Sequence, residues 1–235
     1  MMFKIIIEKL KRIYYYSSSE RYCKYLRNSG IKIGGGTKFR PKTTIVDLTR
    51  PSLVTIGQNC YMNEHFTLLT HDWVTHVFIN AGMNFIPSSG RVVIGNNVSF
   101  GQNVMVLKGV KIGDNCFIGA NSLVTKDIPA NSIAAGSPCK VICTLSDYHK
   151  KRELLYENEA LEYARSIQER FARRPVVTDF WEEFPLFVSG DKLDDYPELH
   201  QIIRNQCGPM YEDYISSHKS KYESFEAFLQ AAGIK

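Results

Sequence analysis

An apolar residue recurs at every sixth position through the middle of the chain. From Ile94 onward, this first series is Ile94, Phe100, Val106, Ile112, Ile118 and Val124. A second series runs four residues later with the same period, as Val98, Val104, Val110, Cys116 and Ser122. Upstream, the first series recurs as Ile56, Met62 and Leu68. An α-helix has a period of 3.6 residues and a half-buried strand a period of two, so neither produces this repeat.

A six-residue repeat supplies one short extended strand and one tight corner. Three such sides close a triangular coil of about 18 residues, and stacked coils hydrogen-bond as parallel strands. We expect the first series to point into this prism, and small residues of the second series to let the chain turn. Glycine and asparagine, as in Gly95-Asn96-Asn97, accept the backbone angles that a corner requires.

The composition is that of an ordinary globular chain. Of 235 residues, 44% are hydrophobic and 23% are charged, which predicts one main domain with an appendage. The net charge of +5 is mild and no basic block is present, so a nucleic-acid partner is not expected. The six cysteines form no CxxC pair. Free thiols and a cytoplasmic location are therefore expected, rather than disulfides or a thiolate zinc site.

Residues 1–30 are predicted to form a helical cap on the open end of the repeat. Apolar residues recur there at helical spacing, as Phe3, Ile6, Ile7, Leu10, Ile13 and Tyr14. Charged residues interrupt this run, so neither a signal peptide nor a transmembrane segment is expected. Packing on its own domain is the favoured interpretation of this face, and docking on a membrane surface or a partner is the alternative.

The stretch from IGQNC (residues 56–60) to SPCKVI (residues 137–142) resembles the hexapeptide-repeat acyltransferases. Within them it is most similar to the branch of maltose, galactoside and capsular-polysaccharide O-acetyltransferases. The closing string TKDIPANSIAAGSPCKVI is the most specific part of the likeness. The resemblance implies a mainly β fold, with a left-handed parallel β-helix over residues 31–145. It also implies acetyl-CoA as acyl donor, a sugar or glycan acceptor, and a homotrimer with active sites between subunits.

The repeat is interrupted between Leu68 and Ile94, which lie 26 positions apart instead of six. About 20 residues therefore leave the β-helix, as a loop over residues 73–91. The string THDW stands at the start of this loop, where the family places its general base, so the resemblance makes His71 the catalytic candidate. Histidine suits acyl transfer to a hydroxyl because it accepts a proton near neutral pH. Asp72, or a carboxylate from elsewhere such as Glu64, is the expected partner of the imidazole.

A metal site is the rival interpretation of the histidines. His71 and His76 match the spacing of a histidine pair in the gamma-class carbonic anhydrases, which share the β-helix. Those enzymes need a third histidine from about two coils earlier. No histidine precedes His65, which falls on a different side of the prism. Two histidines make a poor catalytic zinc site, so no metal is expected.

The last coils resemble the donor site of the family. By position, the residues that would contact the pantetheine arm are Gln102, Ala120, Thr125 and Lys126. Lys140 aligns with a basic residue near the nucleotide end, where a lysine acts as a point charge on phosphate.

The acceptor side departs from the family pattern. Ser99 stands where a tryptophan usually lines the active site. The asparagine that contacts sugar acceptors in the galactoside branch falls near Thr43, with Asp47 and Asn63 close by. We take Asn63 and Trp73 as acceptor contacts, with Trp73 supplying the missing aromatic wall.

Residues 146–235 exceed the usual family ending and are predicted to form a helical C-terminal extension. A charged helical stretch runs to about Arg173, and short helices are expected at 195–206 and 222–232. The aromatic-rich string PVVTDFWEEFPLFVSG lies between them. Its aromatic content indicates packing on its own prism, on the next subunit or on a biosynthetic partner.

The sequence thus favours an O-acetyltransferase that uses acetyl-CoA and acts on a hydroxyl of a sugar or surface polysaccharide, with His71 as general base. The alternatives are an N-acetyltransferase of an amino-sugar nucleotide and a non-catalytic β-helix that serves as an assembly module. An enzyme would lose turnover on His71→Ala, whereas a binding module would be indifferent.

Overall fold

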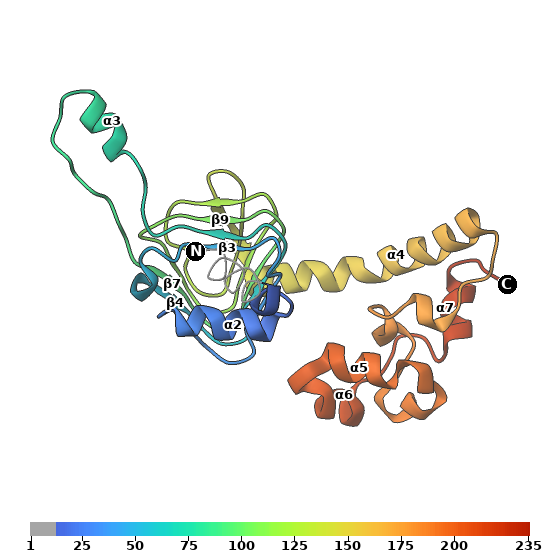
Figure 1. Ribbon diagram of the computed structural model, residues 1–235. Coiled ribbons are helices and arrows are strands. Elements are labelled where there is room, and N and C mark those ends of the chain that lie inside the picture. Colours follow the sequence, from blue (N-terminus) through green and yellow to red (C-terminus); the bar gives the residue numbers. More distant parts are fainter. Residues whose placement is uncertain (1–12) are drawn as a thin grey trace. The chain divides into compact units, whose positions relative to one another are not determined.

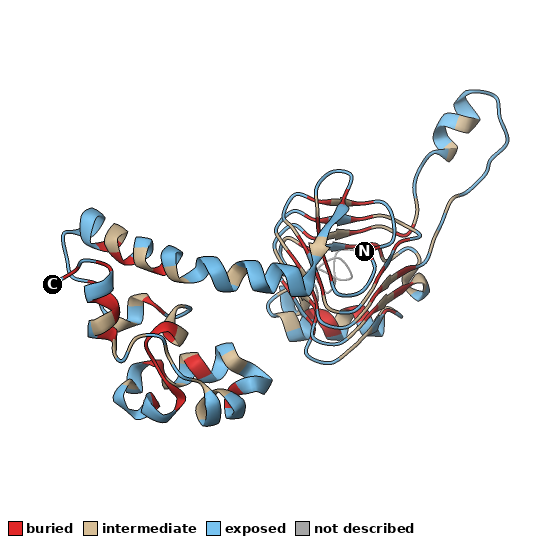
Figure 2. Cartoon of the chain, turned by 180° about the vertical axis from the view of Figure 1, so that it is seen from behind, coloured by how far each residue is buried: buried red, intermediate tan, exposed pale blue. Residues whose placement is uncertain are grey.

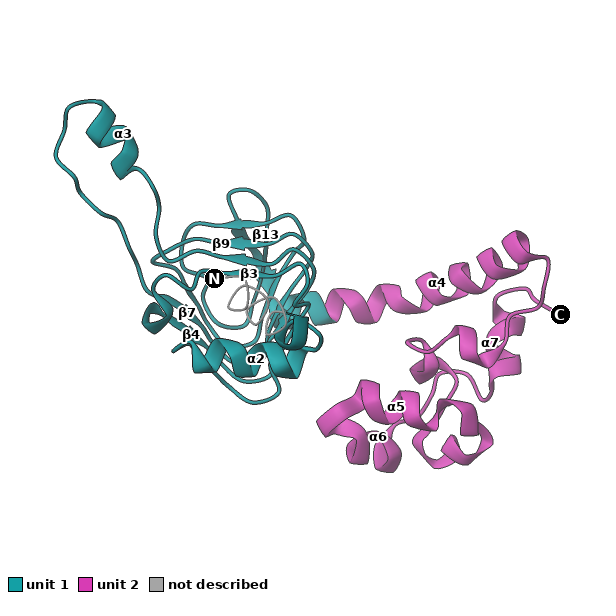
Figure 3. Cartoon of the chain, in the orientation of Figure 1, with its two compact units in different colours: residues 1–149 teal, residues 150–235 magenta. Residues whose placement is uncertain are grey.

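The structure is a computed structural model that describes residues 13–235. The chain divides into two compact units, residues 1–149 and residues 150–235 (Figure 3). Most of the helical face predicted near the N-terminus lies outside the described residues.

The first unit is a parallel β-helix built from three sheets (Figure 1). The strand orders are β1-β4-β7-β10, β2-β5-β8-β11-β13-β14 and β3-β6-β9-β12. Neighbouring strands pair in parallel, apart from the antiparallel pair β13 and β14. The strands are β1 Lys32–Ile33, β2 Lys38–Phe39, β3 Ile45–Val46, β4 Val54–Ile56, β5 Tyr61–Met62, β6 Thr67–Leu68, β7 Val92–Ile94, β8 Val98–Phe100, β9 Met105–Val106, β10 Lys111–Ile112, β11 Cys116–Ile118, β12 Leu123–Val124, β13 Ser132–Ala135 and β14 Lys140–Thr144.

Six α-helices and six short 3-10 helices accompany these strands in the described part of the chain. The α-helices are α2 Ser19–Asn28, α3 Thr75–Asn80, α4 Leu145–Phe171, α5 His200–Cys207, α6 Tyr211–Ser217 and α7 Phe225–Ala231. The 3-10 helices are η1 Pro51–Leu53, η2 Val177–Asp179, η3 Phe184–Leu186, η4 Gly190–Asp195, η5 Pro197–Leu199 and η6 Gly208–Met210. The predicted fold class is confirmed: mainly β, with a left-handed parallel β-helix, an N-terminal helix, an extruded loop and a helical C-terminal extension.

The first apolar series forms the centre of the prism, as the six-residue period predicts. Ile94, Phe100, Val106 and their repeats are at most 2% exposed, and Figure 2 shows buried residues along the coils. Each fully buried side chain of this size contributes about 1.5–3 kcal/mol relative to an exposed one. The repeat therefore supplies both the shape and much of the stability of this unit.

The corners lie at asparagines, as the string Gly95-Asn96-Asn97 predicted, and the second series does not itself form the turns. Its members are also buried, with Val98 and Val104 both at 0% exposure. The turns fall one residue earlier, at asparagines with left-handed backbone angles, such as Asn97 (φ 53°) and Asn115 (φ 56°). Asparagine tolerates this conformation because its short polar side chain bonds locally. Here the amides also form a ladder, since Asn97 Nδ2 donates to Asn115 Oδ1 at 2.9 Å.

Glycine follows the first series because adjacent coils approach closely. A Cβ atom added at Gly101 would lie 2.5 Å from the backbone nitrogen of Ala120 on the next coil. No positive φ is needed at this position. Steric contact between coils is therefore the reason for the recurring glycine.

Helix α2 packs on the first coil of the prism. Ser18 caps its N-terminus, since its hydroxyl accepts a hydrogen bond from the amide of Arg21 at 3.3 Å. Tyr22, Cys23 and Leu26 are buried and belong to the same apolar cluster as the prism core.

The interrupting loop leaves the prism between β6 and β7 (Figure 1). His71 and Ser89 form an antiparallel bridge at its neck, and the amide of Gly90 donates to the carbonyl of Thr70 at 2.9 Å. Helix α3 lies within the loop. This closed neck fixes His71 on the rigid prism although the following residues extend outward.

Residues 150–235 have an apolar core of their own. Helix α4 contributes Ala160, Ala164 and Ile167, and the aromatic-rich string contributes Phe180 and Phe187. Both phenylalanines are at most 1% exposed. Part of the string therefore packs on helices of its own unit, a partner that was not among the three expected ones.

No helix within residues 13–235 combines the length and the apolar character needed to cross a membrane. All six cysteines are free thiols.

Candidate active site

The candidate catalytic residues of the first unit follow the C-terminal ends of the strands in the β3-β6-β9-β12 sheet. Val46, Leu68, Val106 and Val124 are in register across this sheet. The residues that follow them therefore share one corner of the prism. Asp47 follows β3, Thr70 and His71 follow β6, Lys108 follows β9, and Thr125 and Lys126 follow β12.

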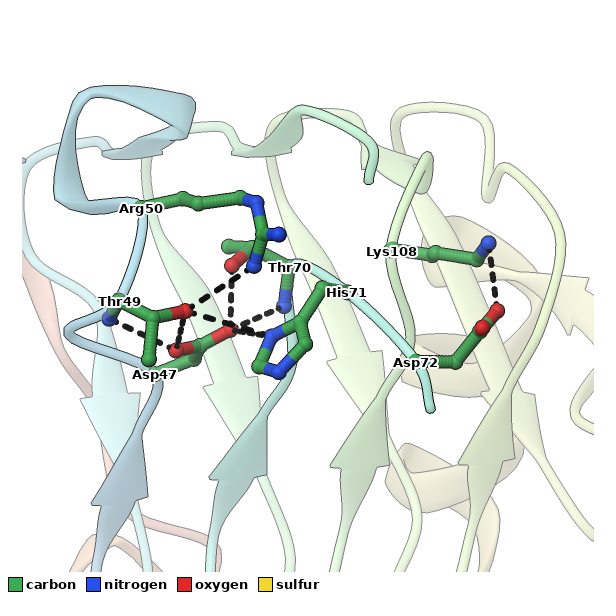
Figure 4. Close-up of polar contacts among 7 residues, drawn as sticks. All are labelled: Asp47, Thr49, Arg50, Thr70, His71, Asp72 and Lys108. Atoms are coloured by element: carbon green, nitrogen blue, oxygen red, sulfur yellow. Dashed lines mark hydrogen bonds and ion pairs between the residues drawn. The ribbon is translucent and has the colours of Figure 1, made fainter. Parts of the chain in front are cut away.

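His71 is held by a buried carboxylate from the preceding coil (Figure 4). Its Nδ1 lies 2.6 Å from Asp47 Oδ2, and their side chains are 17% and 4% exposed. A carboxylate only accepts hydrogen bonds when ionised, so Nδ1 carries the proton in this contact. Within the described residues, none of the hydrogen bonds involves Nε2. In the neutral ring, Nε2 is then the nitrogen that accepts a proton.

Asp47 accepts hydrogen bonds on both carboxylate oxygens. Oδ2 accepts from the amide of Thr70 at 3.0 Å and from the Thr70 hydroxyl, while Oδ1 accepts from the amide and hydroxyl of Thr49 at 2.9 and 2.7 Å. Burial raises the pKa of Asp47, but the hydrogen bonds from Thr70, Thr49 and His71 outweigh it and hold the pKa well below its usual range. Asp47 is therefore ionised at neutral pH and fixed in one orientation.

Of the expected partners of His71, the two named carboxylates, Asp72 and Glu64, are wrong, whereas a carboxylate from elsewhere in the chain, Asp47, takes this role. Asp72 Oδ2 forms an ion pair with Lys108 Nζ at 2.6 Å, and this hydrogen bond lowers the pKa of Asp72. Glu64 lies near another corner, where its carbonyl accepts from the amide of Asn103 at 2.8 Å. The side chain of Asp72 points along the prism toward the next coil (Figure 4), so it does not orient the imidazole.

A pocket of about 260 Å³ lies beside His71. The prism contributes Thr49 and Arg50 to its wall, and the loop contributes Trp73 and Phe85. Trp73 is 67% exposed, with its ring 6.1 Å from that of His71.

His76 does not join His71 at a common site. Its ring stacks on the indole of Trp73, with centroids 4.9 Å apart and planes 15° apart. Within residues 13–235, no group of three His, Cys, Asp or Glu side chains is arranged to hold a metal ion.

Four of the residues expected to contact the acyl donor lie at opposite ends of the strands of one sheet. Gln102 and Ala120 precede strands β9 and β12, whereas Thr125 and Lys126 follow β12 on the His71 corner. Lys140 begins β14 and is exposed.

Of the two expected acceptor contacts, one lies beside His71. Trp73 lines the same pocket as His71. Asn63 precedes β6, at the same ends of the strands as Gln102 and Ala120. A single chain thus brings His71 together with Trp73 in one pocket and places Thr125 and Lys126 at the same corner two coils away, whereas Asn63 lies at another corner.

Sequence reasoning missed Thr49, Arg50 and Thr70, and noted Asp47 without a role. The missing signal was the register. Val46 and Leu68 pair across β3 and β6, so the residues just after them lie on neighbouring coils, but their separation of 22 positions is not a multiple of six and hides this register in the sequence.

Comparisons with known proteins identify the repeat. Residues 91–126 match the family model described as bacterial transferase hexapeptide (six repeats). The chain is 43% identical over 123 residues to the galactoside O-acetyltransferase of Escherichia coli (strain K12), which covers 52% of this chain and 58% of that protein. It is 30% identical over 121 residues to the putative acetyltransferase YvoF of Bacillus subtilis (strain 168), covering 52% and 64%. The chain thus spans less than two thirds of the length of each relative.

Two solved structures are also similar. A galactoside acetyltransferase in complex with coenzyme A has 27% identity and a TM-score of 0.42, covering 61% of this chain and 80% of that one. A maltose O-acetyltransferase from Clostridium difficile 630 has 27% identity and a TM-score of 0.41, covering 58% and 83%.

Residues 91–126, a part of the repeat that builds the prism, thus match the hexapeptide-repeat transferase family. Within that family, the resemblance to the galactoside O-acetyltransferase branch that the sequence indicated is confirmed.

Proposed function

We propose that this protein is an acetyl-CoA-dependent O-acetyltransferase that acts on a hydroxyl of a sugar or surface polysaccharide. Its similarity to galactoside O-acetyltransferase supports this reaction class. The observation that carries the proposal is the contact between His71 Nδ1 and Asp47 Oδ2 at 2.6 Å, beside a pocket. This contact holds the imidazole in the tautomer that a general base needs.

In the proposed reaction, His71 Nε2 accepts the proton of the acceptor hydroxyl while the oxygen attacks the thioester carbonyl carbon. The C–O bond forms, the C–S bond breaks, and the sulfur of coenzyme A leaves with the electron pair. His71 then returns its proton to that sulfur, so the products are an O-acetyl ester and free coenzyme A. Asp47 favours proton transfer because its negative charge stabilises the imidazolium.

The donor site is proposed to be shared between subunits of a homotrimer. Gln102 and Ala120 lie where the strands of the β3-β6-β9-β12 sheet begin, whereas His71, Thr125 and Lys126 lie where they end. A three-fold assembly can bring one edge of a prism to the opposite edge of its neighbour, because a head-to-tail interface repeats until it closes. Lys126 and Lys140 would then offer positive charge to the phosphates of the donor.

Calorimetric titration with acetyl-CoA tests the donor half, and sugar-dependent release of the coenzyme A thiol tests the reaction. We expect about one donor site per chain and thiol release that depends on an acceptor sugar. Absence of binding at millimolar acetyl-CoA, or thiol release that no sugar stimulates, would contradict the proposal.

Mixed oligomers test whether the site is shared. His71→Ala and Ala120→Trp should each abolish transfer when expressed alone. Co-expression should restore activity in about one quarter of the sites, because random trimers then contain an interface with both native residues. Mixed oligomers that stay inactive would place His71 and Ala120 in the same subunit's site or in no common site.

A further inference from the structure

Arg50 stands beside the pocket because the first coil is longer than the later ones. Val46 and Val54 are eight positions apart, whereas Val106 and Val110, which share their registers, are four apart. The extra residues form η1, which begins at Pro51 with Arg50 as its N-cap. The amide of Leu53 donates to the carbonyl of Arg50 at 3.0 Å. This local turn fixes the backbone of Arg50 next to His71.

Arg50 lines this pocket, and its guanidinium has no carboxylate partner among the described residues. Its Nη1 donates to the Thr49 hydroxyl at 3.2 Å, and within residues 13–235 no ion pair involves it. The carboxylate of Asp72 is occupied by Lys108, and that of Asp47 accepts from Thr49, Thr70 and His71. Arg50 is half-buried, and Figure 4 shows its side chain extending over this cluster.

The loop places apolar groups in the same pocket. Trp73, Phe85 and Pro87 line it together with Arg50 and His71. A volume of about 260 Å³ is below the range of about 300–1,000 Å³ typical of drug-sized ligands, so the pocket suits a single ring. An apolar wall with one convergent cation is the arrangement expected for a ring that carries one anionic group.

We propose that the acceptor is an acidic sugar and that Arg50 binds its carboxylate. A guanidinium matches a carboxylate through two parallel hydrogen bonds. A singly charged group is favoured over a phosphate because Asp47 and Asp72 lie in or beside the pocket and would repel a second negative charge. Arg50 is thus a specificity-determining residue. This inference rests on the proposed function for the identity of the ligand as acceptor, but the binding site itself is testable without turnover.

The test compares sugars that differ in a carboxylate. Methyl galactoside and methyl galacturonide, and methyl glucoside and methyl glucuronide, are titrated into the full chain by calorimetry. We expect each uronide to bind about tenfold more tightly than its neutral partner, the effect of one charge-assisted hydrogen bond of about 1.5 kcal/mol. Arg50→Gln should abolish this preference. Arg21→Gln is the matched control, because Arg21 is an exposed arginine on α2 that donates to Ser17.

Equal affinity for both members of each pair in the native chain, or a preference that survives in Arg50→Gln, would overturn the inference. If Arg50→Gln fails to fold in a thermal melt, Arg50→Lys replaces it. A reduced preference is then expected, and an unchanged one counts against Arg50.

Thiol release from acetyl-CoA, measured in the same samples, separates the two proposals. Transfer to neutral sugars without an Arg50-dependent preference would leave the proposed function standing and remove the inference. Arg50-dependent binding of uronides without any transfer would remove the proposed function and retain the acidic-sugar site.

Discussion

Asp47 and His71 are 24 positions apart in the sequence, yet Oδ2 of one lies 2.6 Å from Nδ1 of the other. They meet because β3 and β6 are neighbours in one sheet and each residue follows the end of its strand. The carboxylate side chain is 4% exposed. A buried ionised group that donates nothing and accepts from Thr49, Thr70 and His71 is a fixed support for the imidazole.

Asp47→Asn should lower kcat without changing the KM for acetyl-CoA. The amide presents a weaker acceptor and removes the charge that stabilises the imidazolium, so we expect a loss of about 10- to 100-fold. Steady-state kinetics measure this split. Asp114→Asn is the control, because Asp114 accepts from the backbone amide of Asn96 at 2.7 Å on another corner. A kcat that falls equally in both variants would indicate a structural role for Asp47.

The stability of the chain should depend on the ionisation of Asp47 at low pH. Its pKa in the folded chain is below its ordinary value of 3.8, so the ionised form contributes stability that is fully present above about pH 4. That contribution is lost as the pH falls from there through the folded pKa. We therefore expect the difference in Tm between the native chain and Asp47→Asn, measured from pH 7 to pH 3, to become smaller only below about pH 4. A difference in Tm that is constant over the whole range, or that grows toward pH 3, would exclude this linkage.

Trp73→Ala should raise the KM for the acceptor sugar while leaving the KM for acetyl-CoA unchanged. The indole lines the pocket beside His71, and its removal deletes apolar wall area of that pocket, which Thr125 and Lys126 do not line. We expect a rise of about tenfold, equal to about 1.4 kcal/mol of lost binding. Trp181→Ala, in the second unit, is the matched control. An unchanged acceptor KM would remove Trp73 from the acceptor site.

Gly101→Ala should destabilise the first unit. The new methyl group would lie 2.5 Å from the backbone nitrogen of Ala120, and backbone cannot yield as a side chain does. We expect a loss of about 1–3 kcal/mol in the free energy of unfolding, as for other overpacked sites. Gly35→Ala should be nearly neutral in the same urea titration, because no atom lies within 4 Å of its added Cβ. Equal stabilities of the two variants would show that the coils can separate.

The sequence predicted the prism well because its period is local. Each six-residue unit contains its own strand and corner, so the burial of Ile94 or Val106 can be predicted from the neighbouring sequence alone. His71 was found for a similar reason, since the break in the repeat marks the loop. The corner at Asn97 was also predicted, since glycine and asparagine mark turns locally, whereas the second series is core because two buried series share one period.

Asp47 and Arg50 could not be found in this way. Four extra residues between β3 and β4 break the regular spacing, so their nearness to His71 appears only in space. The core of residues 150–235 has no period either. Phe180 and Phe187 pack on α7, which follows them by about 40 residues, and such contacts leave no local pattern.

The most direct test of the central claim is the initial rate at which His71→Ala releases coenzyme A in the presence of a sugar. The rate is measured at a saturating concentration of acetyl-CoA, chosen from the affinity that calorimetry gives. We predict unchanged affinity for acetyl-CoA and a rate lower by about 10²–10⁴-fold, the contribution of a general base. His76→Ala, which alters the other histidine of the loop, should stay within about threefold of the native rate. A His71→Ala variant that transfers acetyl groups at the native rate would contradict the assignment of His71 as the base.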